Sequence, residues 1–129
     1  MATERDDVFS RGPVRLGPLE GQILDALWSG GPASVREIIE RLGGGPAYTT
    51  IATVLGNMRR KGVVESGRKG RFVQYAATYS REVHAARQME EALSASDDRA
   101  ASILHFVEAI EPTDLELLRN YLDGRKDEP

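Results

Sequence analysis

The stretch "AYTTIATVLGNMRRKG", residues 47–62, combines a threonine-rich beginning, an apolar stripe and three consecutive cations. Four apolar side chains recur at the spacing of one buried helix face, and they are Ile51, Val54, Leu55 and Met58. The other face, which carries the threonines, is then turned toward solvent or a partner. Gly62 is placed to end the helix in a left-handed cap. The stretch is therefore either an ordinary core helix whose cations suit the helix dipole, or a helix that enters a DNA groove.

Two shorter helical patterns precede this stretch. One begins at Pro18, a residue that suits the first helical position, and places Leu19, Ile23 and Leu27 on one face. The next begins with "SVRE", residues 34–37, where the Ser34 hydroxyl and the Glu37 carboxylate can form a capping box.

A two-stranded hairpin is expected after the third helix. Val63 and Val64 begin the first strand, and residues 72–75 lie in the second. The link "GRKG", residues 67–70, is a glycine-bounded turn with two cations at its tip. Three short helices followed by such a hairpin predict a winged helix-turn-helix with a two- or three-stranded wing sheet.

The rest of the chain is predicted to be helical, so the fold class is mainly α. Helical patterns cover residues 81–95 and 98–110, and a third follows Pro112 with a capping box beginning at Thr113. Three short helices cannot enclose a large core by themselves, so we expect them to pack against a second copy of the chain rather than fold back on the winged domain. The predicted dimer interface comprises Ile103, Phe106, Val107, Ile110, Leu115, Leu118 and Leu122.

Charge is divided unevenly along the chain. The formal net charge is -3, yet residues 46–75 hold six Lys and Arg residues and a single acid, Glu65. Residues 76–129 hold six cations and twelve anions. A basic centre in an acidic chain favours an anionic partner for that segment. The sequence has no cysteine, no apolar run of membrane-spanning length and no signal-peptide pattern, which predicts a cytoplasmic, nucleoid-associated protein.

The predicted winged fold assigns roles to the helix of residues 47–62 and to the hairpin. Recognition helices meet base edges in their first turns, and Thr can bond to bases or offer its methyl to thymine. The predicted base-reading residues are Thr49, Thr50, Thr53 and Asn57. The predicted phosphate contacts are Tyr48, Arg59, Arg60, Lys61, Lys69 and Arg71.

Other classes of function find less support in the sequence. His84 and His105 lie 21 positions apart without a cysteine partner, so no metal site and no cofactor is expected. No phosphate-binding glycine loop and no nucleophile with a base at motif spacing is present, so no enzyme activity is expected. A winged-helix module for protein contacts, or an architectural module without specific DNA readout, remains the alternative.

The run "AYTTIATVLGNMRRKGVV" followed by "GRFVQY" resembles the BlaI/MecI penicillinase repressor family. The likeness is strongest over residues 15–78. It implies a dimeric repressor of inverted-repeat operators, connected with β-lactam resistance or envelope stress. It also implies release by a membrane sensor metalloprotease, with a candidate cleavage site at His105–Phe106.

The predicted organisation therefore has four parts. Residues 1–14 form a flexible tail, residues 15–78 a winged-helix DNA-binding domain, residues 79–124 a helical dimerisation domain, and residues 125–129 a C-terminal tail. The predicted function is a homodimeric, sequence-specific transcriptional repressor that binds double-stranded operator DNA.

Overall fold

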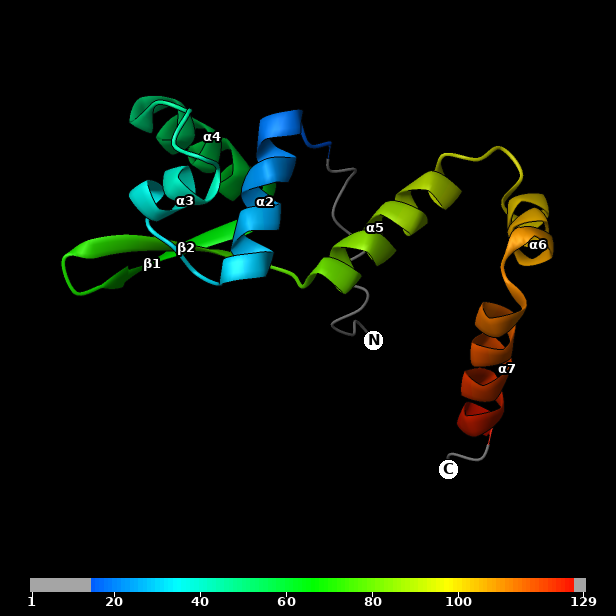
Figure 1. Ribbon diagram of the computed structural model, residues 1–129. Helices are drawn as coiled ribbons and strands as arrows, with labels where there is room; N and C mark the ends of the chain where they lie inside the picture. The colour runs from blue at the N-terminus through cyan, green and yellow to red at the C-terminus, as the bar shows by residue number, and fades with distance from the viewer. Residues whose placement is uncertain (1–14, 127–129) are drawn as a thin grey trace. The chain divides into compact units, whose positions relative to one another are not determined.

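The computed structural model describes residues 15–126, which form six helices and one two-stranded antiparallel sheet. The predicted tail over residues 1–14 and residues 127–129 lie outside the described part. In chain order the elements are α2 (Pro18–Gly30), α3 (Val35–Arg41), α4 (Tyr48–Lys61), β1 (Val64–Lys69), β2 (Phe72–Ala77), α5 (Arg81–Ser94), α6 (Arg99–Ala109) and α7 (Pro112–Lys126) (Figure 1). The chain divides into two compact units, with the boundary between Gln88 and Met89, within α5.

The N-terminal unit is a winged helix-turn-helix, as predicted. Helices α2, α3 and α4 pack together and against the hairpin of β1 and β2 (Figure 1). The core is entirely apolar, and its members are Ile23, Leu24, Leu27, Ala33, Val35, Ile38, Ile51, Leu55, Met58, Val63 and Val64. Full burial of one such large side chain contributes about 1.5–3 kcal/mol, which explains why a helix as short as α3 persists.

Local signals in the sequence set the ends of α3 and α4. The Ser34 hydroxyl accepts a hydrogen bond from the Glu37 amide at 3.2 Å, and the Glu37 carboxylate accepts one from the Ser34 amide at 3.0 Å. The predicted capping box is therefore present. Gly62 has φ 78°, and its amide bonds to the Met58 and Arg59 carbonyls, so α4 ends in the expected left-handed cap.

The hairpin turn lies three residues later than the "GRKG" prediction placed its start. Residues 67–69 belong to β1, and Lys69 pairs with Phe72, which leaves Gly70 and Arg71 as the two turn residues. Gly70 has φ 62°, the left-handed conformation that a tight two-residue turn requires. Gly67 has no such conformation, because it is paired within the strand opposite Gln74.

A single bridge adds a third, minimal strand to the sheet. The Ala33 amide bonds to the Tyr75 carbonyl at 2.9 Å, and the Tyr75 amide bonds to the Ala33 carbonyl at 2.8 Å. The sheet proper has two strands, and the bridge attaches β2 to the residue before the Ser34 cap. The wing is thus connected to the start of α3.

Helices α6 and α7 begin with different caps. The Asp98 carboxylate accepts a bond from the Ala101 amide at 3.0 Å at the start of α6. Pro112 is the first residue of α7, so Thr113 lies inside the first turn, and the capping box predicted to begin at Thr113 is wrong. Pro112 takes the first helical position because its missing N–H would be unpaired there in any case.

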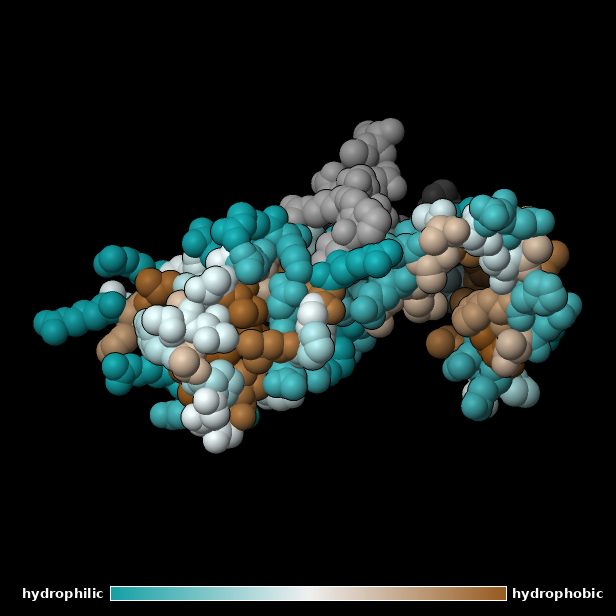
Figure 2. Space-filling model, turned by 90° about the horizontal axis from the view of Figure 1, so that it is seen from above, coloured by the Kyte–Doolittle hydropathy of each residue, from teal (hydrophilic) through white to brown (hydrophobic). Residues whose placement is uncertain are grey.

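From Met89 onward, no described residue is buried in the isolated chain. Figure 2 shows brown, hydrophobic surface over the α6 and α7 segment. Phe106 is 50% exposed and Leu122 is 54% exposed. Among the described residues, no helix is long and apolar enough to cross a membrane.

Candidate nucleic-acid interface

Helix α4 presents two opposite faces, as the spacing predicted. Ile51, Leu55 and Met58 are fully buried, and Val54 is half-buried beside them. Thr49, Thr50 and Thr53 are exposed, and they occupy the first two turns of the helix. Tyr48, at the first helical position, is 53% exposed. The hydroxyl groups of this face are thus held on a rigid helix whose other side forms the core.

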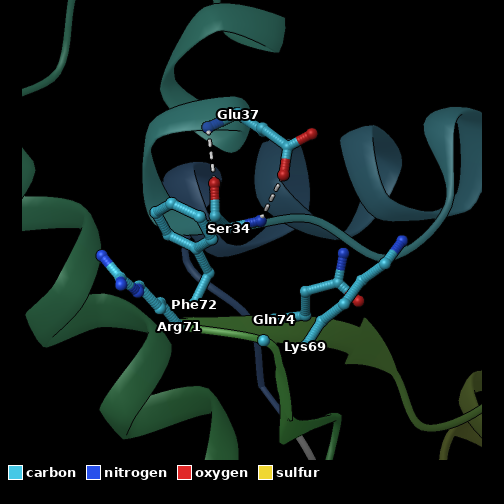
Figure 3. A pocket seen from close by; sticks show the side chains of 7 residues that line it. Ser34, Glu37, Lys69, Arg71, Phe72 and Gln74 are labelled. Carbon is cyan, nitrogen blue, oxygen red and sulfur yellow. Dashed lines mark hydrogen bonds between the residues drawn. The ribbon is translucent and has the colours of Figure 1, made fainter.

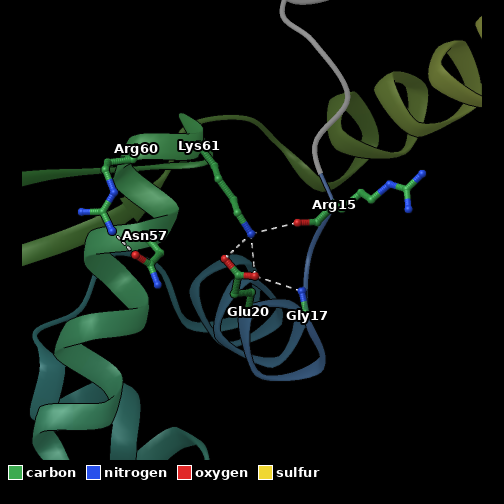
Figure 4. A network of polar contacts seen from close by, with 6 residues as sticks. All are labelled: Arg15, Gly17, Glu20, Asn57, Arg60 and Lys61. Atoms are coloured by element: carbon green, nitrogen blue, oxygen red, sulfur yellow. Dashed lines mark hydrogen bonds and ion pairs between the residues drawn. The ribbon is translucent and has the colours of Figure 1, made fainter.

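Asn57 and Arg60 lie on one side of α4 in the last two turns. The Arg60 guanidinium donates a hydrogen bond to the Asn57 side-chain oxygen (Figure 4). Arg59 and Arg60 are both exposed, whereas Asn57 is half-buried. The side chain of Asn57, which was predicted to read a base, is therefore already bonded to a neighbouring residue of its own helix.

Lys61, one of the predicted phosphate contacts, forms an ion pair within the protein. Its ammonium donates to both Glu20 oxygens, at 2.8 and 2.9 Å, and to the Arg15 carbonyl at 2.9 Å (Figure 4). The Glu20 carboxylate also accepts from the Gly17 amide at 2.9 Å, at the start of α2. Lys61 therefore ties the end of α4 to the start of α2.

This network changes the acidity of Glu20. Partial burial raises the pKa of its carboxyl, but hydrogen bonds from Lys61 and from the Gly17 amide, with the charge of Lys61, outweigh burial. The net pKa lies below the ordinary value of 4.5, so Glu20 is ionised at neutral pH. No local pattern in the sequence indicates this pair, because 41 positions separate its members.

The wing carries cations on and beside a two-residue turn. Lys69 ends β1, Arg71 lies in the turn, and both are exposed. Their side chains line a groove between the turn and the start of α3, together with Ser34, Glu37, Gly70, Phe72 and Gln74 (Figure 3). The groove also contains one acid, Glu37. Hydrogen bonds from the Ser34 amide and hydroxyl keep the pKa of Glu37 below its usual value, so its side chain is an ionised carboxylate at neutral pH.

The predicted interface and cleavage residues of the C-terminal helices are largely exposed. Phe106, Ile103 and Val107 are 50%, 42% and 37% exposed in α6, and Leu118 and Leu122 are exposed in α7. Ile110 and Leu115 are half-buried. His105 and Phe106 are adjacent exposed residues within α6, so the bond between them is in helical conformation.

A cluster of polar and aromatic side chains at the start of α5 was not predicted. The Trp28 indole donates to the Tyr79 carbonyl at 2.9 Å, and its ring lies 5.3 Å from the His84 ring. Arg81 lies over the Trp28 ring and bonds to Asp25 at 2.6 Å. These contacts attach the beginning of α5 to α2 in the N-terminal unit.

Polar residues, rather than the apolar ones, are buried on this part of α5. His84 and Arg87 are buried, and the Arg87 guanidinium lies 4.6 Å from the centre of the Tyr79 ring. The apolar Val83 and Met89 are 36% and 59% exposed. Over residues 15–126, no group of three or more His, Cys, Asp or Glu side chains could hold a metal ion.

Comparison with known proteins identifies relatives of this chain. The family model described as "Penicillinase repressor" matches residues 16–124. Two curated relatives named "Transcriptional regulator BlaI", from two strains of Mycobacterium tuberculosis (CDC 1551 / Oshkosh and ATCC 25618 / H37Rv), are each 37% identical over 115 residues, covering 84% of this chain and 83% of theirs.

Solved structures that match this chain are more distant in sequence. A MarR family protein from Bacillus stearothermophilus matches with a TM-score of 0.47 and 15% identity, covering 95% of this chain and 79% of that chain. A mutant of Lactococcus lactis ZitR in complex with DNA matches with a TM-score of 0.46 and 15% identity, covering 90% of this chain and 77% of that chain. The match to the family model and the 37% identity, over most of the chain in both cases, lead to one conclusion: this chain belongs to the penicillinase repressor family of winged-helix, DNA-binding transcriptional regulators, which are not enzymes.

Proposed function

We propose that the protein is a homodimeric repressor that reads an inverted-repeat operator with the exposed threonine face of α4. The observation that carries this proposal is the arrangement of α4, in which Thr49, Thr50 and Thr53 are exposed opposite a fully buried apolar stripe. A hydroxyl on a rigid helix can bond to a base edge, and the threonine methyl can contact the thymine methyl. Asn57 contributes to readout once its bond to Arg60 is released or shared.

Phosphate contacts surround this reading face in the proposal. Tyr48 lies in the first turn of α4, Arg59 and Arg60 lie in its last turn, and Lys69 and Arg71 reach the DNA backbone from the wing. Lys61 takes a different role from the other cations, because the Glu20 ion pair already holds its ammonium. Its contribution to DNA binding is therefore to position α4.

The exposed apolar residues of α6 and α7 support assembly of two copies. An apolar surface of this extent on short helices is stabilised when a second copy covers it. Two-fold symmetry would then place two α4 helices on one face of DNA, about 34 Å apart, or one helical turn. We place the dimerisation domain over residues 79–124, although α7 continues through residues 125 and 126, which were predicted to belong to the C-terminal tail.

The proposed function includes an inducing pathway and a location. Cleavage at His105–Phe106 by a membrane sensor metalloprotease that responds to β-lactam or envelope stress would separate the two copies. Support comes from the position of this bond in α6, among the proposed interface residues, and from the exposure of His105, which is not one of them. Mass spectrometry of the chain recovered from its host after β-lactam exposure is expected to find a fragment ending at His105, and an intact chain would contradict the pathway. The repressor acts at the nucleoid in the cytoplasm.

Selection from a genomic fragment library tests the central proposal. Bound fragments are recovered at two salt concentrations and sequenced. We expect tight, salt-dependent enrichment of a dyad-symmetric site, because phosphate contacts release counterions. Sequence-blind binding would leave an architectural role, and no binding at either salt concentration would favour a module for protein contacts.

A further inference from the structure

The aromatic side chain at the end of the wing has no role in the core. Phe72 is 68% exposed, the highest value among the exposed large hydrophobic residues of the described chain. It is not a member of the core cluster, nor of the partly buried residues packed against that cluster. The fold therefore does not require a phenyl ring at this position.

The hairpin nevertheless holds Phe72 in a defined place. Phe72 is the first residue of β2 and pairs directly with Lys69 across the two-residue turn. Its ring is directed toward Ser34 at the start of α3, across the groove that the turn and α3 enclose (Figure 3). The bridge between Ala33 and Tyr75 anchors the same strand three residues further on. The ring is thus exposed on a rigid support.

The charges around the ring select the kind of partner. Lys69 and Arg71 flank Phe72, and Arg68 lies one residue further back on β1. The Glu37 carboxylate is the acid on the α3 side of the groove. The excess of cations favours a polyanion over a partner whose surface is neutral or acidic only at its edge. The Glu37 carboxylate disfavours a phosphate on the α3 side of the groove. Phosphates would therefore lie along the turn, and the exposed part of Phe72 is open to the DNA between them.

We propose that Phe72 enters the minor groove beside the site read by α4 and makes the wing sensitive to the base step found there. This inference rests on the proposed operator function. Apolar side chains that contact or partly unstack minor-groove base steps act best at flexible pyrimidine–purine steps. Lys69 and Arg71 then neutralise the phosphates on either side of the minor groove. Phe72 supplies the preference for a base step without adding charge.

The test compares variants on duplexes that share the selected central site and differ only in the flank. One flank carries TA steps, and the other is a G·C-rich sequence without pyrimidine–purine steps. We expect Phe72→Ala to weaken binding to the TA flank by about 5- to 30-fold, the lower part of the range expected for one lost base contact. Binding to the G·C flank should change less than about two-fold, and the salt slope should stay unchanged because no charge is removed.

Two matched variants complete the test. Val73→Ala removes apolar surface from the next residue, which points to the other side of the hairpin and pairs with Arg68, so it should leave the flank preference unchanged. Phe72→Leu should retain part of the preference, because leucine also inserts between base steps. Thermal unfolding followed by circular dichroism should give the same midpoint for Phe72→Ala and wild type.

Three outcomes would overturn the inference. Equal flank preference in Phe72→Ala and wild type, or equal losses in Phe72→Ala and Val73→Ala, would remove the role of Phe72 while leaving the operator proposal intact. Failure of the wild-type protein to enrich any dyad-symmetric site would overturn the operator proposal and this inference together.

Discussion

At the scale of single residues, Thr50 separates base reading from general affinity. It is exposed in the first turn of α4, and its replacement removes no charge and no core contact. We expect Thr50→Ala to lower affinity for the selected operator by about 1–3 kcal/mol and to relax preference at one base position in each half-site. Competition with single-base operator variants measures this. Thr113→Ala, an exposed threonine in α7, is the control and should match wild type.

Glu20 gives a pH-dependent prediction at the same scale. Its pKa is lowered in the folded state, so its contribution to stability is present above its unfolded pKa and is lost as pH falls through the folded value. Glu20→Gln should cost about 1 kcal/mol of unfolding free energy at pH 7, the upper end for a surface ion pair, because the Glu20 side chain is partly buried. The difference should vanish well below pH 4.5. A loss that is equal at both pH values would contradict the role of the charge.

At the scale of elements, the wing should contribute to affinity for DNA but not to recognition of the central bases that α4 reads. Replacing Lys69 and Arg71 together by Ala should weaken binding to all sequences and lower the slope of log affinity against log salt by up to about two. The matched control is Arg119→Ala with Arg125→Ala in α7, which removes the same charge from the other unit. An unchanged slope in the wing variant would show that the turn does not touch phosphate.

Elements whose signals are local could be predicted from the sequence. The capping box at Ser34 and the left-handed Gly62 are confirmed, because each depends on a few neighbouring residues. The turn position was wrong because "GRKG" offers two glycines, and only the pairing of the strands places Gly70 at positive φ. The cap at Thr113 was wrong because Pro112 competes for the first helical position.

Contacts between distant residues could not be predicted in this way. The amphipathic pattern of α4 indicated which face is exposed, but it did not show that Lys61 pairs with Glu20. Which residues of α5 are buried likewise depends on the α2 side chains beside them. His84 is buried against Trp28 of α2, while the neighbouring Val83 is exposed. The identity of an exposed face was therefore predictable from periodicity, whereas the partner of each charged side chain depended on tertiary structure.

At the scale of the whole molecule, dimerisation is the property on which operator symmetry depends. Leu115→Asp places a charge within the predicted interface, where an unpaired carboxylate is costly to bury. Light scattering after gel filtration should report about 14.2 kDa for this variant and about twice that for wild type. Asn120→Asp, an exposed near-isosteric change in the same helix, should remain dimeric. A dimer of unchanged stability in the Leu115 variant would contradict the assigned interface.

The bridge between Ala33 and Tyr75 has a thermodynamic consequence for recognition. Because β2 is bonded to the residue before α3, the wing and the helices of the N-terminal unit are ordered together before any DNA arrives. Ordering one backbone residue costs about 1–2 kcal/mol of conformational entropy at room temperature. A wing that became ordered only on the duplex would lose that entropy at every association event. Here the backbone loss belongs to folding, so it is not subtracted again from the free energy of the wing contacts with DNA.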